Sequence, residues 1–129
     1  MRLVYILLLS VVLVFSVTCT KTSDSKEFNC IIGNTYKVSD RMSFVIDSLN
    51  DSRCQPGMMC FWAGQVILYM NISTGGSLMD TTFYLGNSGM KPVIIGGYSF
   101  KADSVYPISA GTTKSKEITV KMTIIPAGS

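Results

Sequence analysis

Two cysteines six positions apart mark the segment of this 129-residue chain whose side chains could do chemistry, DSRCQPGMMCFWAG at residues 51–64. Cys54 and Cys60 could form a disulfide, or they could hold Cu(I) together with Met58 and Met59, because Cu(I) prefers sulfur ligands. Zinc fits poorly, since the chain has no histidine and zinc sites use Cys, His and carboxylates. The Pro-Gly pair inside the segment lets the chain fold back. We therefore expect a disulfide and no metal, with roughly 2–2.5 kcal/mol gained from closing so short a loop.

The residues around the two cysteines are of the types that build a structural corner. Asp51 and Ser52 can accept hydrogen bonds from nearby backbone N–H groups. Arg53 can pair with Asp51 or lie against Trp62, the only tryptophan of the chain. We expect the indole ring to pack on the disulfide or on the end of a sheet. The Ala63-Gly64 pair leaves room for close backbone approach before the next strand.

Catalysis requires a base, a nucleophile or a metal in a pocket, and the chain offers little of this kind. The lack of histidine removes the commonest general base and metal ligand. No nucleotide-binding or hydrolase motif is present. Asp47 and Asp51 could form a carboxylate pair, but we interpret them as a strand-end and a turn aspartate. We predict that the protein is not an enzyme, and we expect no cofactor.

The first 18 residues have the composition of a secretory signal. Met1-Arg2 precedes residues 3–17, which carry no charge and are too few to span a bilayer comfortably. A basic start, an apolar run and a small-residue exit are typical of a signal peptide. We expect a signal peptide helix over residues 1–18, with an uncleaved membrane anchor as the alternative.

A cysteine, Cys19, follows this apolar run and precedes a polar stretch. This arrangement resembles the lipobox of bacterial lipoproteins, with Thr18 and Ser16 where a small residue and leucine are usual. The resemblance implies that Cys19 becomes the first mature residue and carries acyl chains, several of which hold a protein firmly to a membrane. Residues 19–27 would then form the lipid attachment and a polar tether. The alternative is ordinary secretion with an unmodified Cys19.

Apolar and polar residues alternate with a period of two from Phe28 onward, which is typical of strands with one face on a core. The pattern occurs in residues 42–49, 65–72, 81–85, 97–102 and 116–125. Turn residues separate these runs, at Gly33-Asn34, Asn50-Asp51, Gly75-Gly76, Gly86-Asn87, Gly96-Gly97 and Gly111. The sequence therefore predicts a single all-β domain over residues 28–129, an antiparallel β-sandwich or small barrel of about seven or eight strands.

The remaining cysteine and the charge balance suggest no further chemistry. Cys30 shares a strand face with Phe28 and Ile32, so we expect a buried thiol, with a bond to Cys19 as the minor alternative. Without residues 1–18 the chain has ten basic and eight acidic residues, a net charge of +2. The basic residues are scattered, and we expect no nucleic-acid partner.

The segment 51–64 is also similar to a motif in a family of small bacterial envelope lipoproteins, mostly of unassigned function. In that motif D-S-R-C and C-x-W-A-G flank a short loop, and the matching residues are Asp51, Ser52, Arg53, Cys54, Cys60, Trp62, Ala63 and Gly64. Pro56 comes one place later than the family's proline. A second match, further along, comprises Tyr98, Tyr106 and Pro107. The resemblance covers most of residues 28–126 and implies an all-β envelope domain without a stated activity.

Together these features predict a lipid-anchored protein of the bacterial cell envelope, facing the periplasm or the cell surface. We expect a non-catalytic binding or structural module, whose partners are the membrane, through the lipid, and a protein or glycan ligand at the loop tips. The alternative is a protease inhibitor that presents the Cys54–Cys60 loop, because a disulfide-braced loop is preorganised for binding. Exposure of Met58 and Met59 would favour that alternative.

Overall fold

The computed structural model describes residues 24–85, 91–108, 111–113 and 116–128. The signal peptide helix predicted over residues 1–18 and the lipidation predicted at Cys19 lie outside these residues, as does the turn predicted at Gly86-Asn87. In the described part of the chain, no helix is both long enough and apolar enough to cross a membrane.

The described residues form nine β-strands, which are arranged in two antiparallel sheets. This confirms the predicted all-β sandwich. The strands are β1 (Lys26–Ile31), β2 (Thr35–Ser39), β3 (Met42–Asp51), β4 (Val66–Thr74), β5 (Ser77–Leu85), β6 (Val93–Ile95), β7 (Tyr98–Tyr106), β8 (Gly111–Thr113) and β9 (Thr119–Pro126). The number exceeds the predicted seven or eight because β6 and β8 are only three residues long. Alternation cannot be recognised over three positions.

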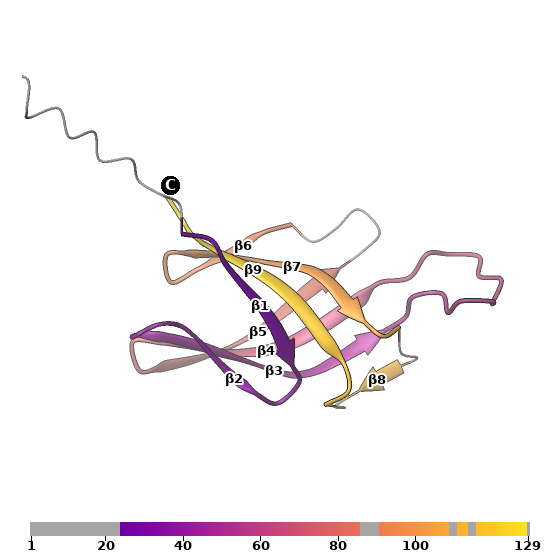
Figure 1. Ribbon diagram of the computed structural model, residues 1–129, viewed down its shortest axis with the longest axis horizontal. Coiled ribbons are helices and arrows are strands. Elements are labelled where there is room, and N and C mark those ends of the chain that lie inside the picture. Colours follow the sequence, from indigo (N-terminus) through magenta and orange to yellow (C-terminus); the bar gives the residue numbers. More distant parts are fainter. Residues whose placement is uncertain (1–23, 86–90, 109–110, 114–115, 129) are drawn as a thin grey trace, which may run out of the picture.

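The two sheets lie face to face (Figure 1). One has the strand order β1-β9-β7-β6, and the other has the order β2-β3-β4-β5. Strand β8 pairs with the last residues of β3, at Leu49 to Asp51, while β2 pairs with the first half of β3. Since β4 occupies the other edge of β3, β2 and β8 follow one another along a single edge.

The core lies between the sheets and consists of the alternating apolar residues that the sequence predicts. Phe44, Phe83 and Phe100 are its largest buried side chains, and the rings of Phe44 and Phe100 meet edge to face with centroids 6.0 Å apart. Burial of apolar surface on this scale stabilises a sandwich by about 25 cal/mol per Å². The outward-facing residues of the same strands are mostly polar, which explains the period of two.

Two of the predicted turns are wrong. Asn50-Asp51 belongs to β3, and Gly111 begins β8. The register pairs Asp51 with Gly111 and also with Val66. Turn-forming residue types therefore lie inside a sheet here, because long-range pairing overrides a weak local preference.

The turns and loops gather at two ends of the sandwich. At the hairpin end, Gly75 N donates to Arg41 O (2.9 Å) and Ala127 N donates to Gly97 O (2.8 Å). The start of β1 lies at this end as well (Figure 1). At the opposite end, the loop between β3 and β4, residues 52–65, projects beyond both sheets (Figure 1). We call this segment the braced loop.

Candidate functional site

A buried ion pair fixes the point where the braced loop leaves β3. Asp51 is 2% exposed. Its Oδ2 accepts a hydrogen bond from Nη2 of Arg53 at 2.7 Å, and its Oδ1 accepts from Nε of the same guanidinium at 2.9 Å. Oδ1 also accepts from the Arg53 backbone N–H at 3.1 Å. A carboxylate in this position must be paired, and the two-pronged contact with a planar guanidinium orients the first residues of the loop.

Arg53 also ties the loop to the other sheet. Its Nη1 donates to the carbonyl oxygen of Val105, in β7, at 3.1 Å. One guanidinium therefore links the end of β3 in one sheet to the end of β7 in the other. Of the two roles predicted for Arg53, the pairing with Asp51 is confirmed.

The two ends of the loop are joined by a compact set of hydrogen bonds. Ser52 N donates to Gln65 O at 2.9 Å, and Ser52 Oγ accepts from Gln65 N at 3.0 Å. Gly64 has φ +69°, and a Cβ added to it would lie 2.0 Å from the Ser52 carbonyl oxygen. This confirms the predicted close backbone approach at Ala63-Gly64, and it explains why the position carries no side chain.

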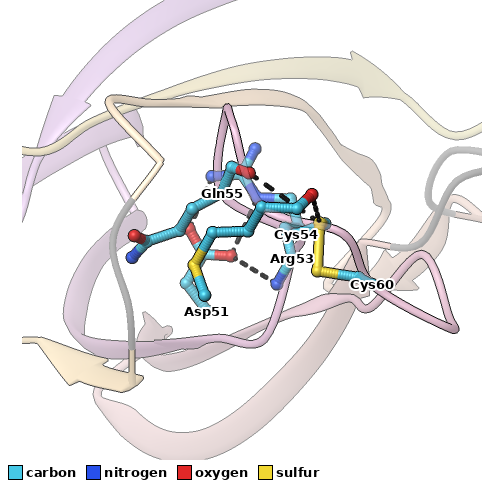
Figure 2. The surroundings of a disulfide bond; sticks show 6 residues. Asp51, Arg53, Cys54, Gln55 and Cys60 are labelled. Atoms are coloured by element: carbon cyan, nitrogen blue, oxygen red, sulfur yellow. Dashed lines mark hydrogen bonds and ion pairs between the residues drawn. A yellow bond between two sulfur atoms is a disulfide. The ribbon is translucent and has the colours of Figure 1, made fainter.

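The predicted disulfide between Cys54 and Cys60 is present, with an S–S distance of 2.12 Å and a Cα–Cα distance of 5.9 Å (Figure 2). Within the segment that the disulfide encloses, Met58 N donates to Gln55 O at 3.1 Å. This bond closes a turn over Pro56 and Gly57, and the φ of Gly57 is +86°. Proline followed by a residue of positive φ is the pattern of a type II turn. Sulfurs bonded to each other cannot serve as two thiolate ligands, so the copper alternative is wrong.

The tip of the braced loop exposes large apolar side chains. Met58 is 65% exposed, Met59 101%, Phe61 106% and Trp62 78%. The prediction that the indole ring packs on the disulfide or on a sheet end is therefore wrong. The loop that carries Trp62 projects beyond the strands that end at Asp51 and begin at Val66 (Figure 1).

The two aspartates considered as a carboxylate pair lie in different environments. Asp51 is buried and bound to Arg53, whereas Asp47 is exposed on the outer face of the sheet. They do not form a catalytic pair. Among the residues that the structure describes, no group of three or more His, Cys, Asp or Glu could hold a metal ion.

Cys30 is fully buried in the core, as predicted. Burial raises the pKa of its thiol to about 12, because the thiolate would lose its hydration inside the sandwich. The group is therefore a small apolar core residue at physiological pH and not a nucleophile.

Three features of the loop were not predicted from the sequence. These are the bond from Arg53 to Val105, the exposure of Phe61 and the exposure of Trp62. One signal was available for the last two, because residues 54–65 contain four large apolar side chains without a strand-like alternation and without any charge.

No family model, curated protein or solved structure matches this chain. The braced loop must therefore be interpreted from its own geometry. It is held by a covalent bond, an ion pair and a hydrogen-bonded neck, and its tip presents uncharged, apolar side chains to solvent. This arrangement can bind a complementary surface.

Proposed function

We propose that this protein is an exported, lipid-anchored module of the bacterial cell envelope that binds a protein partner through the tip of the braced loop. The observation that carries the proposal is the combination of bracing and exposure. Four large apolar side chains are exposed by 65% or more on a loop closed by a disulfide. Exposed apolar clusters of this kind mark interaction sites.

The bracing supports a binding role because it lowers the cost of association. A free loop loses conformational entropy when it binds, while a loop already fixed by the disulfide and the ion pair of Asp51 with Arg53 loses less. Aromatic and methionine side chains are also enriched in the cores of protein interfaces. We place Phe61 and Trp62 at the centre of the contact because both are aromatic and project from the tip.

A protein partner accounts for the loop better than insertion into lipid. Within residues 54–64, the backbone hydrogen bond that closes the tip runs from Met58 N to Gln55 O, and it involves neither Phe61 nor Trp62. The N–H and C=O groups of Phe61 and Trp62 would be costly to bury in hydrocarbon, whereas a protein can pair with them. The braced loop and the start of β1 lie at opposite ends of the sandwich (Figure 1), so an anchor at Cys19 would leave the tip facing away from its own membrane.

A second candidate function, protease inhibition, is favoured by the exposure of Met58 and Met59. An inhibitor must offer an extended, rigid segment whose side chain enters an apolar specificity pocket. The assay is inhibition of chymotrypsin-like, subtilisin-like and papain-like proteases by the full chain. Inhibition that is lost in Met59→Asp, and retained in Leu78→Asp at the hairpin end, would establish this function, and intact protease activity at micromolar protein would exclude it for these classes.

The location is tested by mass spectrometry of the mature N-terminus. A diacyl or triacyl modification on Cys19 is expected, because the residue follows the apolar run and Thr18 at the position of the lipobox cysteine. A mature chain that begins with an unmodified Cys19, or with Thr20, would overturn the lipid anchor and leave the loop's role unaffected.

The partner is tested by crosslinking in intact envelopes, with a photoreactive group introduced at Met59. Crosslinked protein is expected in the wild-type background and should disappear when Phe61 and Trp62 are both changed to serine. Leu78→Ser is the matched control, because Leu78 is 72% exposed on β5, away from the loop. Equal crosslinking in the double variant and the control would contradict a binding role for the tip.

A further inference from the structure

A hollow of about 400 Å³ lies on the outer face of the sheet with the order β2-β3-β4-β5, away from the braced loop. Three strands contribute to it: Asp47 from β3, Tyr69 and Asn71 from β4, and Asp80 and Thr82 from β5. In the register, Tyr69 stands opposite Thr82 and Asn71 stands opposite Asp80. These side chains therefore project from adjacent positions of one rigid surface.

Asp47 lies at a β-bulge of β3. The pairing of β3 with β4 shifts between Ile46 and Ser48, so that Asp47 is the extra residue and has no partner in the register. Bulges redirect a side chain at the expense of one ladder position and are common beside functional sites. The bulge shifts the buried face of β3, so that Leu49 and Asp51 are buried beyond it, while Asp47 remains exposed on the outer face.

The polar groups at the hollow are not used by the fold. In the described part of the chain, neither Asp47 nor Asp80 has an ion pair or a side-chain hydrogen bond to another residue, and Asn71 does not bond to Asp80 opposite it. Strands β3, β4 and β5 contain no lysine or arginine. The donors and acceptors at the hollow are thus available to a ligand.

The outer face of the other sheet shows the contrast. There Lys101 pairs with Asp103 at 3.0 Å, Thr123 donates a hydrogen bond to Asp103, and Lys121 pairs with Glu27 at 3.3 Å. Burial alone would raise the pKa of Asp103, but the hydrogen bonds from Thr123 and Lys101 and the nearby lysine charges lower it below its ordinary value. On that face the polar side chains satisfy one another.

From this arrangement we propose that the hollow binds a neutral carbohydrate. Sugars carry hydroxyl groups that donate to carboxylates and bond to amides, and a less polar C–H face that packs on an aromatic ring. Asp47, Asp80 and Asn71 supply the polar partners, and Tyr69, 40% exposed, supplies the ring. The two carboxylates disfavour an anion, and the polar lining disfavours an apolar ligand.

The size and position of the hollow agree with this ligand class. Small-molecule sites have volumes of about 300–1,000 Å³, and the hollow lies within that range. It is open to solvent along a sheet face, which suits a segment of a longer chain that enters and leaves at both sides. This site uses none of the residues of the braced loop, so its test is independent of the proposed function.

The experiment measures binding of the full chain to immobilised tetrasaccharides of glucose, N-acetylglucosamine, mannose and galactose, followed by calorimetric titration of any that bind. We expect at least one to bind. Asp80→Ala and Tyr69→Ala should each weaken that binding about tenfold or more, because a hydrogen bond to a charged group and a stacked ring are each worth this much. Folding of both variants is checked by circular dichroism.

Two controls make the result specific. Glu27→Ala removes one negative charge from the other sheet and should bind as the wild type does, as should the double variant Phe61→Ser, Trp62→Ser. Absence of binding to all four tetrasaccharides at millimolar concentration would overturn the proposal. So would binding that Asp80→Ala and Tyr69→Ala leave unchanged, or a preference for spermidine that disappears in salt, which would indicate a simple acidic surface.

Discussion

Replacing Arg53 by methionine is the most direct test of how the braced loop is held. The change leaves the Asp51 carboxylate, whose side chain is fully buried, without its guanidinium and removes the bond to the Val105 carbonyl. Breaking a buried ion pair by removing one partner costs about 3–5 kcal/mol. Because the Arg53 side chain is itself 22% exposed, we expect the lower end of that range, about 3 kcal/mol.

The measurement is urea unfolding of the full chain followed by circular dichroism, since Trp62 is exposed and would report only on the loop. With a slope of about 1.5 kcal/mol per M, a loss of about 3 kcal/mol lowers the unfolding midpoint by about 2 M. The double variant Asp51→Asn, Arg53→Met should recover part of the loss, because the buried negative charge is gone.

A matched control uses the exposed pair of Lys101 with Asp103, where the lysine side chain is 48% exposed. Lys101→Met should cost about 0–1 kcal/mol, as is usual for surface ion pairs. If Arg53→Met costs no more than Lys101→Met, or if the double variant loses as much as the two single losses added together, the reasoning about the buried pair is refuted.

The further predictions concern three single positions. Gly64→Ala should lower the unfolding free energy by about 2 kcal/mol or more, since an alanine would be strained at positive φ and its Cβ would meet Ser52 O. Gly57→Ala is the control for the backbone cost alone, because Gly57 has positive φ but open space around it. Equal urea midpoints for the two variants would rule out the clash. The Cys30 thiol, with its pKa raised to about 12, should react with iodoacetamide at pH 8 only as fast as the protein unfolds. The unfolding free energy should also fall as the pH rises from about 9 toward that pKa, because only the unfolded thiol ionises there, and a Cys30→Ala variant should lack this fall. Asp103→Asn should lower the unfolding free energy at pH 7, because the pKa of Asp103 is lowered in the folded state. The difference in unfolding free energy between wild type and variant should close as the pH falls below about 3.9, the ordinary aspartate pKa. A constant difference down to pH 3 would contradict the link between this pKa and stability.

The fold follows from the sequence wherever one strand face is buried. Met42, Phe44 and Ile46, for example, recur at every second position and are buried, and the same holds in β4 and β9. Prediction failed at Asn50-Asp51 and at Gly111, where residue types favour turns but long-range pairing makes a strand. Local preference is worth too little to decide such positions against a ladder.

The candidate site divides in the same way. The disulfide and the pairing of Arg53 with Asp51 could be predicted because they join residues close in sequence, six and two positions apart. The contact of Arg53 with Val105 spans 52 positions and depends on how the two sheets stack. The exposure of Trp62 was predicted wrongly because residue type indicates a preference for burial but not whether a neighbouring surface exists.

By itself, the sequence determined the all-β class, the buried face of most strands and the covalent closure of the loop at Cys54 and Cys60. These depend on short-range patterns, a period of two and a small separation along the chain. Only the tertiary structure decided that the loop tip is exposed at the end opposite the start of β1, and that Asp47, Asn71 and Asp80 face one hollow. Both depend on strand register and sheet stacking, which bring together residues that are distant in the sequence.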